Sequence, residues 1–111
     1  MFPRRLRLSR AGFAQVAASP AAKRAVGEYF SIQTAPEGAG IGVVVSKKVA
    51  RRAVDRHRLK RKIREAVRLL NIKPEIGLII YARSGATSLP FSKIQTELAP
   101  LLRPSTVSAT L

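Results

Sequence analysis

The segment 47–68 constrains this chain more than any other, because it combines a dense run of positive charge with helical periodicity. Ten of its first eighteen residues are Lys or Arg, and the one acid among them is Asp55. Apolar residues recur from position 59 at the spacing of one helix face, which predicts a stripe that packs on a core. The stripe consists of Leu59, Ile63, Ala66, Val67 and Leu70. The opposite side is cationic and carries His57, Arg61, Arg64 and Arg68.

This charge pattern favours a polyanionic partner. Like charges one helical turn apart repel each other, and almost no acid relieves them here. The whole chain has a net charge of +15 from 21 basic and 6 acidic residues, which is typical of a nucleic-acid binder. An anionic membrane surface is the weaker alternative, because membrane-bound helices usually set large apolar side chains opposite the basic face and this stripe is aliphatic.

Length and composition limit the remaining possibilities. The 111 residues fit one domain that buries its own core, which we place at 1–103, followed by a flexible tail at 104–111. The absence of cysteine excludes disulfides, thiolate zinc sites and a cysteine nucleophile. No apolar run reaches the 18 or so residues that span a bilayer, so we expect a soluble, cytoplasmic protein. The Arg-rich segment 1–19 leaves an organellar transit peptide as a minor alternative.

The pattern along the chain predicts alternating helices and strands. Ser9 is placed to cap a first helix that ends near Ala18. Ser88 with Pro90 is placed to open a last helix that directs inward Phe91, Ile94, Leu98 and Leu101. The basic helix is expected to begin between 51 and 55 and to end near Asn71, before Pro74. The strands are expected at 29–34, at 41–46 and 76–82 with both faces buried, with an additional short strand within 25–27.

These elements predict an α+β sandwich: a small mixed sheet with helices on one face, in the order αβββαβα. The strands 29–34 and 41–46 are expected to pair as a hairpin. The strand 41–46, the basic helix and the strand 76–82 form a crossover unit, which the general rule for such units predicts to be right-handed.

No catalytic constellation is present in the sequence. The six acids are scattered singly, so they predict neither a carboxylate pair nor a two-metal site. The one histidine, His57, lies among arginines and is better explained as a polar contact than as a general base. The glycines 38, 40 and 42 precede a strand and are interpreted as turn residues rather than as a phosphate loop.

Two features suggest contacts with single-stranded nucleic acid. Phe13, Tyr29 and Phe30 are candidates for a platform on which bases stack, with core packing as the alternative for each. Ser46, Lys47 and Lys48 close a strand with a cationic cluster, which suggests phosphate contacts.

The run GVVVSKKVARRAVDRHRLKRKIREAVR resembles the signature region of the bacterial ribonuclease P protein component. In that family a strand ends in S-K-K and leads to a helix bearing R-N-R-x-K-R-x-x-R-E. The matching positions here are Ser46, Lys47, Lys48, Ala53, Arg56, Arg58, Lys60, Arg61, Arg64 and Glu65. The resemblance implies a left-handed crossover, against the general rule. It also implies a helix that contacts catalytic RNA, a cleft between the first helix and the sheet that holds the 5′ leader of precursor tRNA, and chemistry carried out by the RNA and its bound Mg²⁺.

The resemblance assigns roles to individual residues. It implies catalytic-RNA contacts by Arg56, Arg58, Lys60, Arg61 and Arg64, and leader contacts by Phe13, Lys47 and Lys48. The charge and aromatic patterns add Arg51, Arg52, His57 and Arg68 to the first set, and Tyr29 and Phe30 to the second. The expected partners are ribonuclease P RNA and precursor tRNA, with no membrane, no DNA and no metal ligand in this chain.

Three positions depart from the family pattern: His57 stands where Asn is usual, Ala17 where a second aromatic is common, and Gln33 where Tyr is frequent. Two other classes of function remain open at this point. A structural RNA-binding protein of the ribosome would share the charge and the fold class. A DNA-binding helix is disfavoured, because the basic helix offers no Asn or Gln before Asn71 to read base edges.

Overall fold

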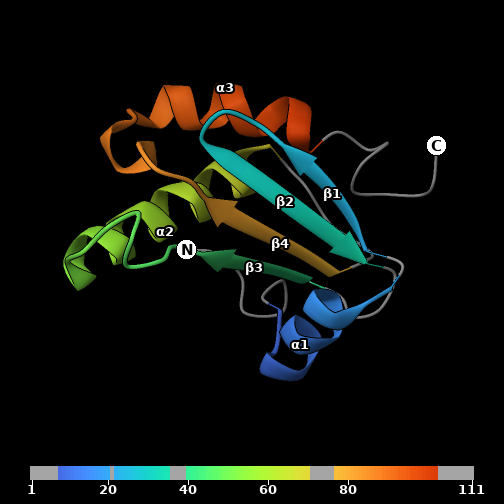
Figure 1. Cartoon of the computed structure of the whole chain (residues 1–111). Coiled ribbons are helices and arrows are strands. Elements are labelled where there is room, and N and C mark those ends of the chain that lie inside the picture. The colour runs from blue at the N-terminus through green and yellow to red at the C-terminus, as the bar shows by residue number, and fades with distance from the viewer. Residues whose placement is uncertain (1–7, 21, 36–39, 71–76, 103–111) are drawn as a thin grey trace.

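The computed structural model describes residues 8–20, 22–35, 40–70 and 77–102. The predicted order αβββαβα is confirmed (Figure 1). The elements are α1 (Arg10–Ala18), β1 (Lys23–Val26), β2 (Phe30–Ala35), β3 (Gly40–Val44), α2 (Ala53–Leu69), β4 (Gly77–Ala82), the short 3-10 helix η2 (Ala86–Ser88) and α3 (Phe91–Leu101). The predicted cap of the first helix is also confirmed, because Ser9 Oγ accepts a hydrogen bond from the Gly12 N–H at 3.0 Å. The predicted stop at Pro74 and the tail at 104–111 lie outside the described residues.

The four strands form one mixed sheet in the order β1-β2-β4-β3. β2 pairs antiparallel with both β1 and β4, whereas β3 pairs parallel with β4. The predicted hairpin between β2 and β3 is therefore wrong. The physical reason lies in β4, whose residues Leu78, Ile79 and Ile80 are fully buried and so need neighbours on both sides and cover on both faces. β3 lies at the edge, and its Gly42 and Val44 are only half-buried.

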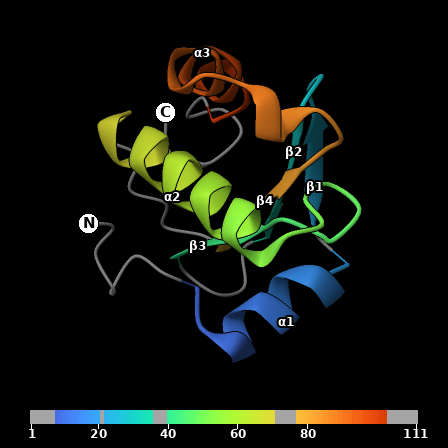
Figure 2. The same ribbon diagram turned by 90° about the vertical axis from the view of Figure 1, so that its left-hand side faces the viewer.

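Helices cover both faces of the sheet, so the expectation of helices on one face is also wrong. α2 and α3 lie on one side and α1 lies on the other (Figures 1 and 2). Alternation along the strands explains this arrangement, because Ile32 and Ile80 point to the α2 and α3 side while Ala35 and Ile79 point to α1. A sheet that is apolar on both faces needs a cover for each.

The connection from β3 through α2 to β4 is a left-handed crossover (Figures 1 and 2). The expectation from the resemblance is therefore confirmed, and the general right-handed rule fails here. A right-handed connection would place α2 on the side of α1, away from α3. The left-handed one lets α2 and α3 close a single core above the sheet.

That core contains the predicted apolar stripe of the basic helix. Leu59, Ile63, Ala66 and Val67 are buried, and Leu70 packs at the margin. α3 contributes Ile94 and Leu98, both fully buried as predicted. The buried side fixes the rotation of α2 about its axis, so it also fixes which basic side chains face outward.

Candidate nucleic-acid interface

The cationic side of α2 lies opposite its buried stripe, as predicted. His57, Arg61 and Arg68 are exposed there, and Lys60 and Arg64 are half-buried along its margin. We call these five residues the cationic side of α2. Arg51 and Arg52 are exposed just before the helix, and Asp55 in the first turn interacts favourably with the helix dipole.

Ion pairing reduces the positive charge at the C-terminal end of this side. Arg68 Nε donates to Glu65 Oε1 at 2.9 Å, and Arg68 also bonds the second carboxylate oxygen. This bond lowers the pKa of the Glu65 carboxyl below its usual value and raises the pKa of Arg68. Arg52 forms only a long pair with Asp55, at 3.9 Å between an exposed arginine and a partly buried aspartate. Ion pairing therefore offsets part of the positive charge of α2 at Arg68.

Arg56 turns back toward the chain that precedes the helix. One of its terminal nitrogens donates to the Ala50 carbonyl at 3.0 Å and to the Arg51 carbonyl at 2.9 Å. The Ser46 carbonyl accepts from the N–H groups of Val49 and Ala50, both at 3.1 Å. The exposed turn that carries Lys47 and Lys48 is thus anchored to β3 at one end and, through Arg56, to α2 at the other.

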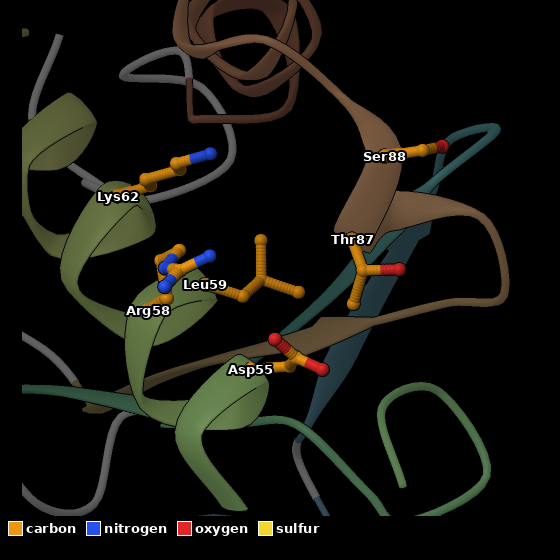
Figure 3. Close-up of a pocket in the computed structure, with 6 residues that line it drawn as sticks. All are labelled: Asp55, Arg58, Leu59, Lys62, Thr87 and Ser88. Atoms are coloured by element: carbon orange, nitrogen blue, oxygen red, sulfur yellow. The ribbon is translucent and has the colours of Figure 1, made fainter. Parts of the chain in front are cut away.

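Arg58 lies on the other flank of α2, which faces η2. With Asp55, Leu59, Lys62, Thr87 and Ser88 it lines a pocket of about 310 Å³ (Figure 3). The figure shows the Asp55 carboxylate between α2 and Thr87, and the Ser88 hydroxyl donates to the Gly85 carbonyl at 2.8 Å. Because an acid lies beside the two cations and one hydroxyl is already bonded, this pocket is poorly suited to a phosphate.

The sheet face on the α1 side is divided into two parts. Cross-strand partners share a face, so the register places Gln33, Ile79 and Gly42 in one row, which α1 covers. The next row runs across all four strands and consists of Val26, Ser31, Tyr81 and Val44. We call this second set the open row, because Val26 is 66% exposed and the other three are half-buried.

Phe13 borders the open row from α1. Its ring lies against Gly42, since a Cβ on that glycine would lie 2.9 Å from Phe13 Cδ2. The interpretation of Gly42 as a turn residue is therefore wrong: it lies within β3 and leaves space for an aromatic ring. β3 ends at Val44 and leads to the turn with Lys47 and Lys48, so the strand connects the Phe13 contact at Gly42 with two lysines.

Gly42→Ala is expected to displace the Phe13 ring, because the added methyl would overlap it. Overpacking of this kind costs about 1–3 kcal/mol of unfolding free energy. Thermal unfolding monitored by circular dichroism measures this loss. Gly42→Ala combined with Phe13→Ala removes the overlap and should recover part of the stability lost in Phe13→Ala alone. Additive losses in the double variant would contradict the contact.

The three aromatic residues predicted to form one platform do not come together. Phe30 is fully buried in the core beneath α2 and α3, so its predicted contact with the leader is wrong. Tyr29 also lies on the α3 side, where its N–H donates to the Glu97 carboxylate at 3.0 and 3.1 Å and its ring lies against Gly85. Only Phe13 lies on the α1 side. Tyr81, which was not predicted from the sequence, is brought to the same surface by the register of β4.

Within the described residues, no three His, Asp or Glu side chains lie close enough to hold a metal ion. No helix in this part of the chain is long and apolar enough to cross a membrane. His57 is exposed among cations and has no carboxylate partner within the described residues.

Comparisons with known proteins agree with these features. The family model described as Ribonuclease P matches residues 2–105. The chain belongs to the ribonuclease P protein family. It is 38% identical to the ribonuclease P protein component of Chromohalobacter salexigens and 41% identical to that of Idiomarina loihiensis, in each case over 106 residues that cover 92% of this chain and 83% and 85% of the relatives.

Solved structures of the family share the fold. The ribonuclease P protein of Staphylococcus aureus matches with a TM-score of 0.73 at 25% identity, over 89% of this chain and 93% of the other. That of Thermotoga maritima matches with a TM-score of 0.74 at 25% identity, over 86% and 94%. The predicted assignment is confirmed: this is the protein subunit of an endoribonuclease whose catalysis is RNA-based.

The three departures from the ribonuclease P family pattern lie in different surroundings. His57 is exposed on the cationic side of α2, and Ala17 is exposed on α1. Gln33, in contrast, is only 3% exposed. Its amide nitrogen donates to the Val16 carbonyl at 3.2 Å, and its amide oxygen accepts from the Tyr81 hydroxyl at 3.0 Å. Gln33 therefore joins α1 to the sheet instead of facing solvent.

Proposed function

We propose that this subunit uses two separate surfaces for two RNAs. The cationic side of α2, with Arg51 and Arg52, binds the phosphates of ribonuclease P RNA. The α1 side of the sheet, with Phe13, Lys47 and Lys48, binds the single-stranded 5′ leader of precursor tRNA. The open row is the observation that supports this division best, because α1 does not cover it. Its β3 member, Val44, is the last residue of the strand and precedes the turn that carries Lys47 and Lys48.

The two surfaces differ in the chemistry that they offer. The cationic side of α2 has no exposed aromatic residue, so it is suited to phosphates and to the shape of folded RNA. The α1 side combines an aromatic ring with lysines, which is the combination that binds single strands through stacking and charge. We expect Arg58 to contribute less than its neighbours, because it faces the mixed-charge pocket beside η2.

Cleavage in this proposal belongs to the RNA and the Mg²⁺ that it binds. Mg²⁺ prefers oxygen ligands in near-octahedral geometry, and the described residues of this chain provide no such cluster. The subunit contributes by holding the leader and by offsetting phosphate repulsion between precursor tRNA and ribonuclease P RNA. A cytoplasmic location follows from this role, because bacterial precursor tRNA is processed there.

We propose a positioning role for Arg56 instead of a direct RNA contact. Arg56→Met should release the Ala50 and Arg51 carbonyls and loosen the turn with Lys47 and Lys48. Loss of these hydrogen bonds is expected to weaken precursor tRNA binding roughly 3- to 10-fold. The slope of log affinity against log salt concentration for ribonuclease P RNA should stay unchanged, whereas Arg61→Met should lower it by about 0.9. A similar drop for Arg56→Met would show that Arg56 contacts a phosphate itself.

The test of the proposed function is cleavage of a precursor tRNA by bacterial ribonuclease P RNA at limiting Mg²⁺, with and without this protein. We expect faster cleavage at the mature 5′ end when the protein is present. Tight RNA binding without any stimulation would contradict the proposal and would favour a general RNA-binding role, such as that of a ribosomal protein.

A further inference from the structure

Tyr81 is the one aromatic residue of the open row. It lies between Ser31 of β2 and Val44 of β3, which are its partners in the register. Serine and valine are small, and α1 does not cover this row. Tyr81 is half-buried and packs at the margin of the cluster formed by Val16, Ala35 and Ile79.

The hydrogen bond to Gln33 determines how the Tyr81 side chain lies. Side chains of strands usually stand roughly perpendicular to the sheet. The Tyr81 hydroxyl, however, donates to the side chain of Gln33, which is a diagonal neighbour two residues further along β2 than Ser31. Gln33 is itself held by its bond to the Val16 carbonyl. The Tyr81 ring is therefore held toward Gln33 along the sheet, while the side chain as a whole stays half-buried and in part accessible to solvent.

Tyr81 and Phe13 are neighbours on this surface. Phe13 lies against Gly42, and Tyr81 is paired with Val44, two residues further along the same strand. Two residues of a strand span about 7 Å. Lys47 and Lys48 follow in the same direction. Followed in the direction of β3 and into the turn after it, the order is therefore the Phe13 ring, the Tyr81 ring, and then Lys47 and Lys48.

We propose that Tyr81 stacks on a base of the bound single strand and that Gln33 is the residue that positions it. This inference rests on the proposed function, because it adds a second stacking residue to the leader surface. It gives the surface two rings from different elements, Phe13 from α1 and Tyr81 from β4.

The test uses the complex of this protein with ribonuclease P RNA under non-cleaving conditions. Affinity is measured for a precursor tRNA with an intact leader, for precursors that lack one leader base at a time, and for mature tRNA. Tyr81→Ala is expected to lower affinity for the intact precursor roughly 5- to 150-fold, the range for one stacked base. Affinity for mature tRNA should not change. Base removal should weaken wild-type binding at more than one leader position, and at one of these positions it should have no further effect in Tyr81→Ala.

Matched variants separate stacking from stability. Tyr81→Phe keeps the ring and should bind within about 3-fold of wild type, while Tyr81→Leu keeps bulk without a flat ring and should behave like Tyr81→Ala. Tyr29→Ala is the control for the loss of a half-buried tyrosine, because Tyr29 lies on the α3 side of the sheet. This variant should still bind precursor tRNA more tightly than mature tRNA. Gln33→Leu removes the same Tyr81–Gln33 hydrogen bond as Tyr81→Phe, so it should lower precursor affinity by a similar factor of up to about 3-fold and cause no further loss in a Tyr81→Phe background. Any purely structural effect of Gln33 would appear in both backgrounds.

Two negative results have different meanings. If wild-type protein favours precursor over mature tRNA and Tyr81→Ala and Tyr81→Leu keep that preference, Tyr81 does not stack and the inference is wrong. If wild-type protein shows no preference for the precursor, the proposed leader surface itself is wrong.

Discussion

Replacing Arg61 and Arg64 together with glutamate is expected to lower the affinity for ribonuclease P RNA by roughly 100- to 10,000-fold. Each residue lies on the cationic side of α2, and a hydrogen bond to a charged group contributes about 1.5–3 kcal/mol. The measurement is a binding titration with ribonuclease P RNA at several salt concentrations. The slope of log affinity against log salt concentration should also fall by about 1.8, as two phosphate contacts are lost.

The matched control for this variant changes the net charge equally at another place. Lys23 in β1 and Lys93 in α3 are both exposed and lie outside the cationic side of α2. Lys23→Glu with Lys93→Glu should therefore lose much less affinity, and only through the long-range field. Equal losses in the two double variants would mean that net charge, rather than this side of α2, determines binding.

Phe30→Ala is expected to destabilise the protein by about 3–5 kcal/mol, which is typical for removing a large aromatic side chain from a core. Phe30 is 0% exposed and lies among the residues that α2 and α3 cover. A loss of this size is a large share of the stability of a small domain. Chemical denaturation monitored by circular dichroism measures the change in the free energy of unfolding.

The control is Val26→Ala, which shortens a side chain that is 66% exposed and should change stability by less than about 0.5 kcal/mol. A Phe30→Ala variant of nearly normal stability would contradict the assignment of this ring to the core. It would restore Phe30 as a candidate for base stacking.

Local patterns were sufficient to predict the helices. The spacing of Leu59, Ile63 and Val67 predicted both the buried side of α2 and the cationic side opposite it. Ser9 predicted the start of α1 because its hydroxyl can bond a free N–H of the first turn. In each of these cases, residues within a few positions of one another determine the structure.

Long-range packing could not be predicted in this way. The pairing of β2 with β4 instead of β3 depends on which strand is buried on both faces, and several runs in the sequence are similarly apolar. The left-handed crossover was predicted only by the family resemblance, whereas the general rule predicted a right-handed one. Gln33 also forms a contact between the sheet and α1 that a polar residue would not predict, since it is buried with its amide bonded to the Val16 carbonyl and the Tyr81 hydroxyl.

In the candidate site, too, features set by local sequence were predicted and features set by long-range contacts were not. The side of α2 that lies opposite its buried stripe was correctly predicted to be cationic, because the helical repeat alone determines which residues lie there. Arg56 was not recognised as a residue that bonds the preceding turn, because charge alone does not show that two carbonyls lie within its reach. Phe30 is fully buried on the α2 and α3 side of the sheet, whereas Tyr81 is half-buried on the α1 side. The strand register determines which side each ring takes, and the sequence alone did not predict that register.

The most direct test of the proposed role compares affinity for precursor tRNA and mature tRNA, measured for ribonuclease P RNA alone and for its complex with this protein. We expect the protein to increase affinity for the precursor while leaving affinity for mature tRNA nearly unchanged. The gain should disappear when the leader is removed. An equal gain for both tRNAs would contradict a leader-binding surface and would leave only a general electrostatic contribution from α2.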